Sequence, residues 1–225
     1  MDHACQWPER ARPPHAVPHA CRIRIDRARV PAQYPVAPLL SDQSESGYSG
    51  LDDFRRFVRM AYEHGVDLRI LISPSHAGLW EAIAQAGVWE KWEKLKRELA
   101  TIVIEEAGGN SPFPLWDFSG YHQFSVVPVP PPDSLQPMPW YADVLHYTNE
   151  LGDFVLDVVL DHPNSSRGIP PGFGVRLTPA TIEPHLAHIR AGREEWREKF
   201  PAHADRIKTF ADEIPDIRIK NATCE

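Results

Sequence analysis

A short run with a nearly continuous apolar core, residues 66–73 (VDLRILIS), follows directly on a segment with helical periodicity. In the helical segment the apolar side chains recur three or four residues apart up to Gly65, and Ser49 is placed to cap its start. A strand that is apolar throughout is typical of a parallel sheet, because both of its faces are covered. Helix followed by buried strand therefore predicts an α/β fold with a mostly parallel sheet.

The same reading gives the remaining elements. Two helices are expected at 79–86 and 88–106 with a break at Gly87, a second buried strand at 114–118, a helix capped by Thr148 that runs to about Leu160, and a last helix at 179–190 followed by a charged extension around Trp196. Prolines remove backbone donors and fix φ, so the proline-rich residues 119–139 predict an irregular loop.

The composition divides the chain into three parts. Residues 1–40 are basic, contain many prolines and lack a sustained apolar period, whereas residues 41–200 carry the regular pattern and residues 201–225 are weakly patterned. We expect one α/β domain over 41–200. The basic head is interpreted either as a disordered interaction arm or as the non-native product of a GC-rich region translated in the wrong frame.

Charge and residue usage exclude several classes of protein. The formal net charge of -7 argues against a protein that neutralises nucleic-acid phosphates. No apolar run is long enough for a membrane span, and residues near Met1 do not form a signal peptide. The three cysteines have neither disulfide nor zinc spacing, and no glycine-rich phosphate loop is present. No i,i+4 pair or His-x-His pattern involves His64, His76, His122, His146 or His162, so we expect no metal and no cofactor.

The most informative stretch is residues 140–147 (WYADVLHY), which contain Asp143-x-x-His146 just before a helix. In a turn at this position, a carboxylate three residues ahead of an imidazole can accept from Nδ1 and leave Nε2 free as a general base. A surface aspartate and a loop histidine with no joint role are the alternative interpretation of so short a pattern.

Four further residues are candidates for substrate binding. His76 lies at the carboxyl end of the first strand, where open α/β sheets place ligands, and its alternative role is to cap or fasten a loop. Asp117 and Ser119 fall at the end of the second strand, where the aspartate can instead cap the turn made with Gly120. Trp140 can contribute an aromatic wall suited to a sugar, or can belong to the core.

Four blocks in a fixed order carry a resemblance to a known family: LRILISPSHA, GVWEKWEKLKRELA, LWDFSGY and MPWYADVLHYTNELGDFVLD. Together with GIPPGFGVRLTP they resemble bacterial proteins of the SGNH/GDSL-hydrolase-like family over about residues 46–190. The resemblance implies a three-layer α/β/α, flavodoxin-like fold. It also implies an acyl-ester hydrolase, or an acyltransferase that modifies envelope polysaccharide, with carbohydrate or acyl-ester substrates.

In this family His146 would be the general base and Asp143 its orienting partner. The chain departs from the family pattern at Leu145, where a small hydroxyl residue is typical. It also lacks the Gly-Asp-Ser-like turn that carries the nucleophile after the first strand. The resemblance therefore implies the carboxy-terminal part of an SGNH-type domain, with an incomplete sheet and no nucleophile, that is inactive alone.

A non-catalytic module that binds glycan or a protein partner through the aromatic residues around Trp140 is the alternative function. It is motivated by the missing nucleophile and by Leu145 beside the histidine. Similar full-length proteins work at the cell envelope, but residues 1–225 themselves carry no address of this kind.

Overall fold

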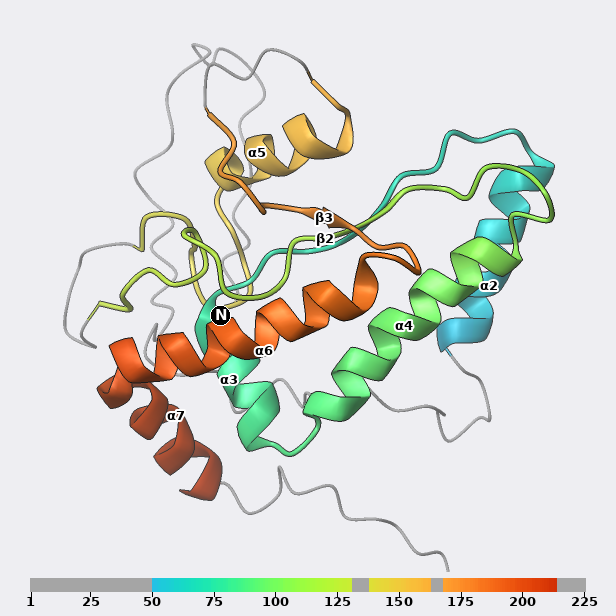
Figure 1. Cartoon of the computed structure of the whole chain (residues 1–225). Coiled ribbons are helices and arrows are strands. Elements are labelled where there is room, and N and C mark those ends of the chain that lie inside the picture. Colours follow the sequence, from blue (N-terminus) through green and yellow to red (C-terminus); the bar gives the residue numbers. More distant parts are fainter. Residues whose placement is uncertain (1–49, 131–137, 163–167, 214–225) are drawn as a thin grey trace, which may run out of the picture.

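The computed structural model describes residues 50–130, 138–162 and 168–213, with side chains as far as residue 209. Along the chain the elements are α2 (Gly50–Glu63), β1 (Ile70–Ile72), α3 (Ala77–Gln85), α4 (Trp89–Glu105), β2 (Leu115–Asp117), α5 (Asn149–Val159), β3 (Val175–Arg176), α6 (Ile182–Lys199) and α7 (Pro201–Glu213) (Figure 1). The expectations for the 1–40 head, for the Ser49 cap and for residues 214–225 lie outside the described residues.

The three strands form one mixed sheet in the order β1-β2-β3. Strand β1 is parallel to β2, with Ile70 opposite Leu115, whereas β3 is antiparallel to β2, with Trp116 opposite Arg176. The α/β prediction is confirmed in this form. The expected mostly parallel arrangement holds for the first pair only, because β3 is a two-residue strand that arrives from a loop and carries no strand pattern of its own.

The first expected strand is shorter and less buried than its sequence indicates. Only Ile70–Ile72 of residues 66–73 form β1, and all three of its side chains are half-buried. Among the described residues β1 pairs with β2 alone, so it lies at an edge of the sheet. Both faces of β1 are nevertheless covered, since Ile70 and Ile72 pack against the core on one face of the sheet and Leu71 packs against the core on the other.

The end of α3 and the start of α5 agree with the local signals in the sequence. Gly87 adopts a φ of 71°, which ends the run of α3, and Thr148 caps α5 with Oγ1 accepting from the N–H of Leu151 at 3.4 Å. The last predicted helix is longer than expected, because α6 extends to Lys199.

The first part of the weakly patterned segment from residue 201 forms α7. Ala204 in this helix is buried in a small cluster with Ala77 and Trp196, and Ile207 packs against the same cluster. Helix α7 has few apolar residues, so its sequence shows no clear helical pattern. Packing against α3 and α6 stabilises it.

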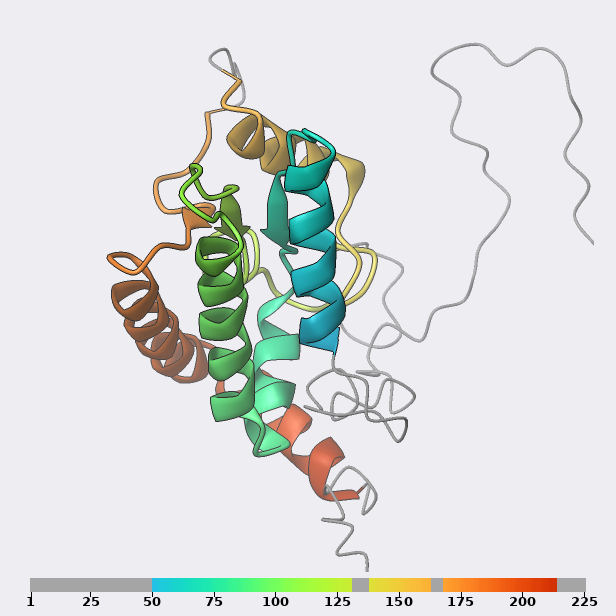
Figure 2. The same cartoon turned by 90° about the vertical axis from the view of Figure 1, so that its right-hand side faces the viewer.

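Helices cover both faces of the sheet (Figures 1 and 2). On one face α3, α4 and α6 surround Leu115 with a core that includes Trp80, Trp92, Val103, Leu186 and Ile189. On the other face α5 and the loops before and after it form an aromatic core that includes Phe118, Phe124, Tyr141, Phe154 and Phe173. Successive residues of β2 point to opposite faces, so this three-residue strand connects the two cores.

Ion pairs fasten α6 across α3 and α4. The buried carboxylate of Glu81 accepts from Arg193 at 2.8 and 3.1 Å, and the carboxylate of Glu93 accepts from Arg190 at 2.8 Å. Near its amino end, α6 also contacts Asp117, the last residue of β2, through His185, and this contact belongs to the polar cluster described below.

Candidate functional site

Asp143 and His146, which the sequence paired, are in contact in the structure. The chain folds into a tight turn between Tyr141 and Tyr147, closed by the N–H of Ala142 donating to the carbonyl of His146 at 2.8 Å. Within the turn Nδ1 of His146 lies 2.9 and 2.8 Å from the two carboxylate oxygens of Asp143. Oδ1 also accepts from the backbone N–H groups of Leu145 and His146, both at 2.8 Å.

The turn exposes the imidazole and shields the carboxylate. The side chain of His146 is 65% exposed and that of Asp143 is 15% exposed. Burial raises the pKa of Asp143, but the hydrogen bonds from His146 and from the two backbone N–H groups outweigh it and hold the pKa below its usual range. The ionised carboxylate therefore fixes the proton on Nδ1 and leaves Nε2 as the base that faces solvent.

No nucleophile accompanies this pair in the part of the chain that the structure describes. Within the described ranges, no serine or threonine hydroxyl makes a hydrogen bond to His146. Leu145, the departure from the family pattern, contributes only its backbone N–H to Asp143. The arrangement can therefore accept a proton from a hydroxyl group that approaches the imidazole of His146.

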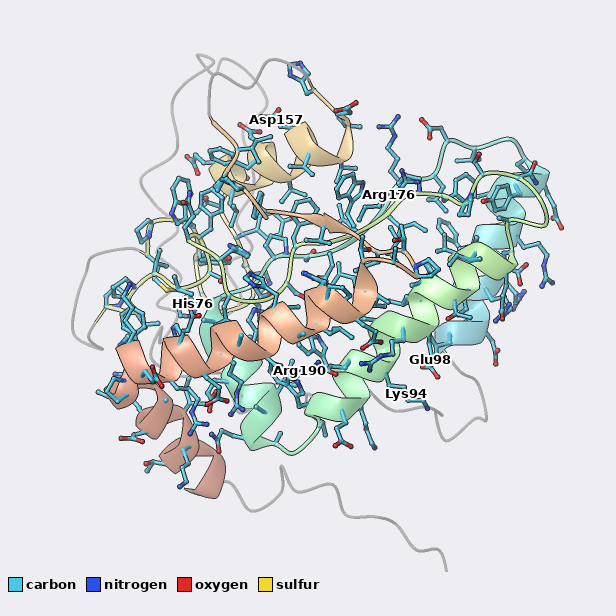
Figure 3. All side chains as sticks on the ribbon, viewed as in Figure 1. His76, Lys94, Glu98, Asp157, Arg176 and Arg190 are labelled. Atoms are coloured by element: carbon cyan, nitrogen blue, oxygen red, sulfur yellow. The ribbon has the colours of Figure 1, made fainter. Side chains whose placement is uncertain are left out.

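His76 is completely buried at the start of α3, where it is the N-cap residue (Figure 3). Its Nδ1 accepts from the N–H of Gly78 at 3.0 Å, and its Nε2 lies 2.7 Å from the carbonyl oxygen of Val127. These two bonds define the tautomer, since Nδ1 must accept and Nε2 must donate. Because both ring nitrogens bond to the backbone, the geometry favours the capping role over contact with a substrate.

Burial lowers the pKa of His76 to about 4. An unfolded imidazole titrates near pH 6.5, so the stability held by neutral His76 is complete above that pH and is lost as the pH falls toward 4, by about 3 kcal/mol. We expect His76→Asn, which keeps an N-cap acceptor and removes the titration, to flatten the fall in urea-unfolding free energy over this window.

The control for that measurement is His64→Asn at the exposed end of α2. His122, whose pKa burial also lowers to about 4, retains its own share of the pH dependence in both variants. A slope identical in wild type and His76→Asn would contradict the assignment.

Asp117 and Ser119 belong to a second, buried cluster with Lys96 of α4 and His185 of α6. The Asp117 carboxylate accepts from the Ser119 N–H at 2.8 Å and from its Oγ at 2.5 Å through Oδ1. Its Oδ2 lies 2.8 Å from Nζ of Lys96 and 3.0 Å from Nε2 of His185. Lys96 also donates to Ser119 Oγ at 2.6 Å, and its Nζ lies 3.5 Å from the ring centroid of Trp92.

The cluster is ionic although it is almost entirely shielded from solvent. The exposed fractions are 1% for the Lys96 side chain and 0% for that of Asp117. Burial raises the pKa of Asp117, but the Lys96 charge and the bond from His185 outweigh it and hold the pKa well below its usual range. Burial lowers the pKa of Lys96, against the attraction of Asp117. The turn-capping role considered for Asp117 is present, and it is combined with an ion pair.

Sequence reasoning missed Lys96 and His185. Lys96 lies four residues after Trp92 on the apolar face of α4, which is a signal for a buried cation, but the charged residues around it hide that signal. Nothing local marks His185, because its partner Asp117 is 68 residues away in the sequence.

A cavity of about 200 Å³ opens beside this cluster. Ser119 and His185 line it, together with the 121–123 segment, the 170–173 segment, and His188 and Ile189 of α6. No residue of the turn that holds Asp143 and His146 contributes to its lining. The structure therefore presents an exposed acid–base pair and a separate cavity.

Trp140 is half-buried in the aromatic core around α5. Its ring centroid lies 4.9 Å from that of Phe124 and 6.0 Å from that of Phe154, with both pairs edge-to-face. The core interpretation of this residue is thus present in the structure, and only part of the ring remains for a ligand.

Among residues 50–130, 138–162 and 168–213, no three histidine, cysteine or acidic side chains gather as a metal site would require. A search of the same residues for a helix with the length and apolar character of a membrane span finds none. Comparison of the chain with family models, curated proteins and solved structures gives no match.

Proposed function

We propose that this chain is the carboxy-terminal part of an SGNH-type acyl-ester hydrolase or acyltransferase with a three-layer α/β/α, flavodoxin-like domain. The observation that supports the proposal is the Asp143–His146 pair, in which a shielded carboxylate holds Nδ1 and Nε2 faces solvent. The four sequence blocks that resemble the family add to it, as do the helices on both faces of the sheet.

In the proposed reaction His146 acts as the general base. Its Nε2 removes the proton of a serine hydroxyl while the serine oxygen attacks the acyl carbonyl carbon, and Asp143 stabilises the imidazolium that forms. The proton is then given to the leaving alcohol as the ester bond breaks. Water or a second hydroxyl takes the acyl group in the following half-reaction. The serine would come from a Gly-Asp-Ser-like turn that this chain does not contain.

The experiment tests the chain with and without the missing block. Several hundred bases upstream are read in three frames for a strand followed by Gly-Asp-Ser or Gly-Asn-Ser, and the longer product is assayed on 4-nitrophenyl acetate. We expect hydrolysis by the longer product, and His146→Ala to reduce it by about 10² to 10⁴. His162→Ala, which changes another exposed histidine, is the control. The proposal would be ruled out if the upstream region contained no such turn. It would also be ruled out if His146→Ala left the rate of hydrolysis unchanged.

The alternative, a glycan-binding module, makes the opposite prediction for the same residues. Saturable binding of an envelope polysaccharide that is lost in Trp140→Ala and unchanged in His146→Ala would favour it. The packing of Trp140 against Phe124 and Phe154 leaves this alternative less supported than the acyl-transfer proposal.

A further inference from the structure

The cavity beside Ser119 lies at the carboxyl end of β2, the edge at which open α/β sheets hold their ligands. Its volume of about 200 Å³ is below the range of drug-sized pockets and corresponds to roughly six or seven water molecules. It therefore suits a ligand no larger than a monosaccharide.

His185 offers the cavity a hydrogen-bond acceptor. Its Nε2 bonds to the Asp117 carboxylate at 3.0 Å, and a carboxylate can only accept, so Nε2 carries the proton. In the neutral ring Nδ1 is then an acceptor, and within the described part of the chain it makes no hydrogen bond. His185 is 8% exposed and lines the cavity.

Ser119 offers a second acceptor. Its hydroxyl group donates a hydrogen bond to the Asp117 carboxylate, and one lone pair of Oγ accepts a hydrogen bond from Nζ of Lys96. One lone pair of Oγ remains, and Ser119 also lines the cavity. His122, another polar residue of the lining, adds no acceptor, since its Nε2 bonds to the Phe118 carbonyl and its Nδ1 accepts from the Ser125 N–H.

The charges select against ionic ligands. Lys96 and Asp117 compensate each other at 2.8 Å, so the cluster has no net charge to attract an ion while His185 is neutral. A cation would approach the Lys96 ammonium, and an anion would meet two acceptor lone pairs. The rest of the lining combines apolar surface from Phe173 and two prolines with the neutral polar groups of Gln123 and Tyr121 and the exposed imidazole of His188.

We infer that this cavity binds a neutral, hydroxyl-bearing ligand of monosaccharide size, with His185 Nδ1 and Ser119 Oγ accepting from its hydroxyl groups. The Lys96–Asp117 pair acts through these two residues, because it fixes the tautomer of His185 and the rotamer of Ser119. The inference does not depend on acyl transfer, since it uses no residue of the Asp143–His146 turn.

The test is ligand-observed NMR and calorimetry on the full chain. The probes are glucose, galactose, mannose and N-acetylglucosamine, with acetate, inorganic phosphate and methylammonium as charged comparisons. We expect millimolar binding of at least one of the sugars and none of the three ions. Failure of all four sugars to bind, or binding of an ion in their place, would overturn the inference.

A pair of variants on α6 locates the binding. His188 is exposed and lines the cavity, so His188→Trp should narrow it and weaken sugar binding at least tenfold. Ala187→Trp adds the same ring at an adjacent exposed position outside the lining and should leave binding unchanged. His185→Phe removes the acceptor directly and should abolish binding, with a thermal melt to confirm folding.

Equal affinity in wild type and His188→Trp would place the sugar elsewhere and refute the site. His146→Ala should leave sugar binding intact, so this measurement stands or fails separately from the acyl-transfer proposal.

Discussion

Replacing Lys96 with methionine is expected to destabilise the protein by about 3 to 5 kcal/mol, because the change leaves the buried charge of Asp117 without its cation. Methionine preserves most of the side-chain volume against Trp92, so the loss reports the charge and its two hydrogen bonds. Urea unfolding followed by tryptophan fluorescence and by circular dichroism measures the effect.

Two comparisons separate the charge from the packing. Lys94→Met changes a lysine on the outer side of the same helix, where it pairs with Glu98 at 3.4 Å (Figure 3), and should cost at most about 1 kcal/mol. Adding Asp117→Asn to Lys96→Met removes the uncompensated carboxylate and should restore part of the stability. If the two lysine variants were equally stable, the buried ion pair would not have the role assigned to it.

Gly174→Ala is expected to cost about 2 to 4 kcal/mol, from a left-handed backbone and an overpacked core. Gly174 has a φ of 79°, and a Cβ on it would lie 2.5 Å from Cε1 of Phe118. Phe118 is 1% exposed and packs against Phe173, so its ring has no free space into which to move. Thermal unfolding, or urea unfolding where heating is irreversible, measures the change.

Gly172→Ala is the matched control for this variant. Gly172 has nearly the same φ, 77°, but its Cβ would meet no atom within 4 Å. It should therefore cost only the backbone part, about 1 to 2 kcal/mol. A Gly174→Ala protein as stable as Gly172→Ala would show that the Phe118 ring yields to the added methyl group.

Features that depend on a few neighbouring residues could be predicted from the sequence. The break at Gly87, the Thr148 cap and the helices around them follow from φ preferences and side-chain capping. The contact between Asp143 and His146 is also local, since three residues and one turn bring the carboxylate to Nδ1.

The tertiary structure decided everything that joins distant segments. Burial of 66–73 depends on neighbouring strands, so an apolar sequence could not reveal that β1 lies at an edge. Helix α7 depends on packing against Trp196. The Lys96–Asp117–His185 cluster joins two helices and a strand, and its formation outweighs desolvation only in that geometry. The sequence by itself determined where the chain turns and that Asp143 and His146 share a proton within one turn. Long-range packing determined which polar residues are buried together and where a cavity remains, because these depend on contacts between segments that are distant in the sequence.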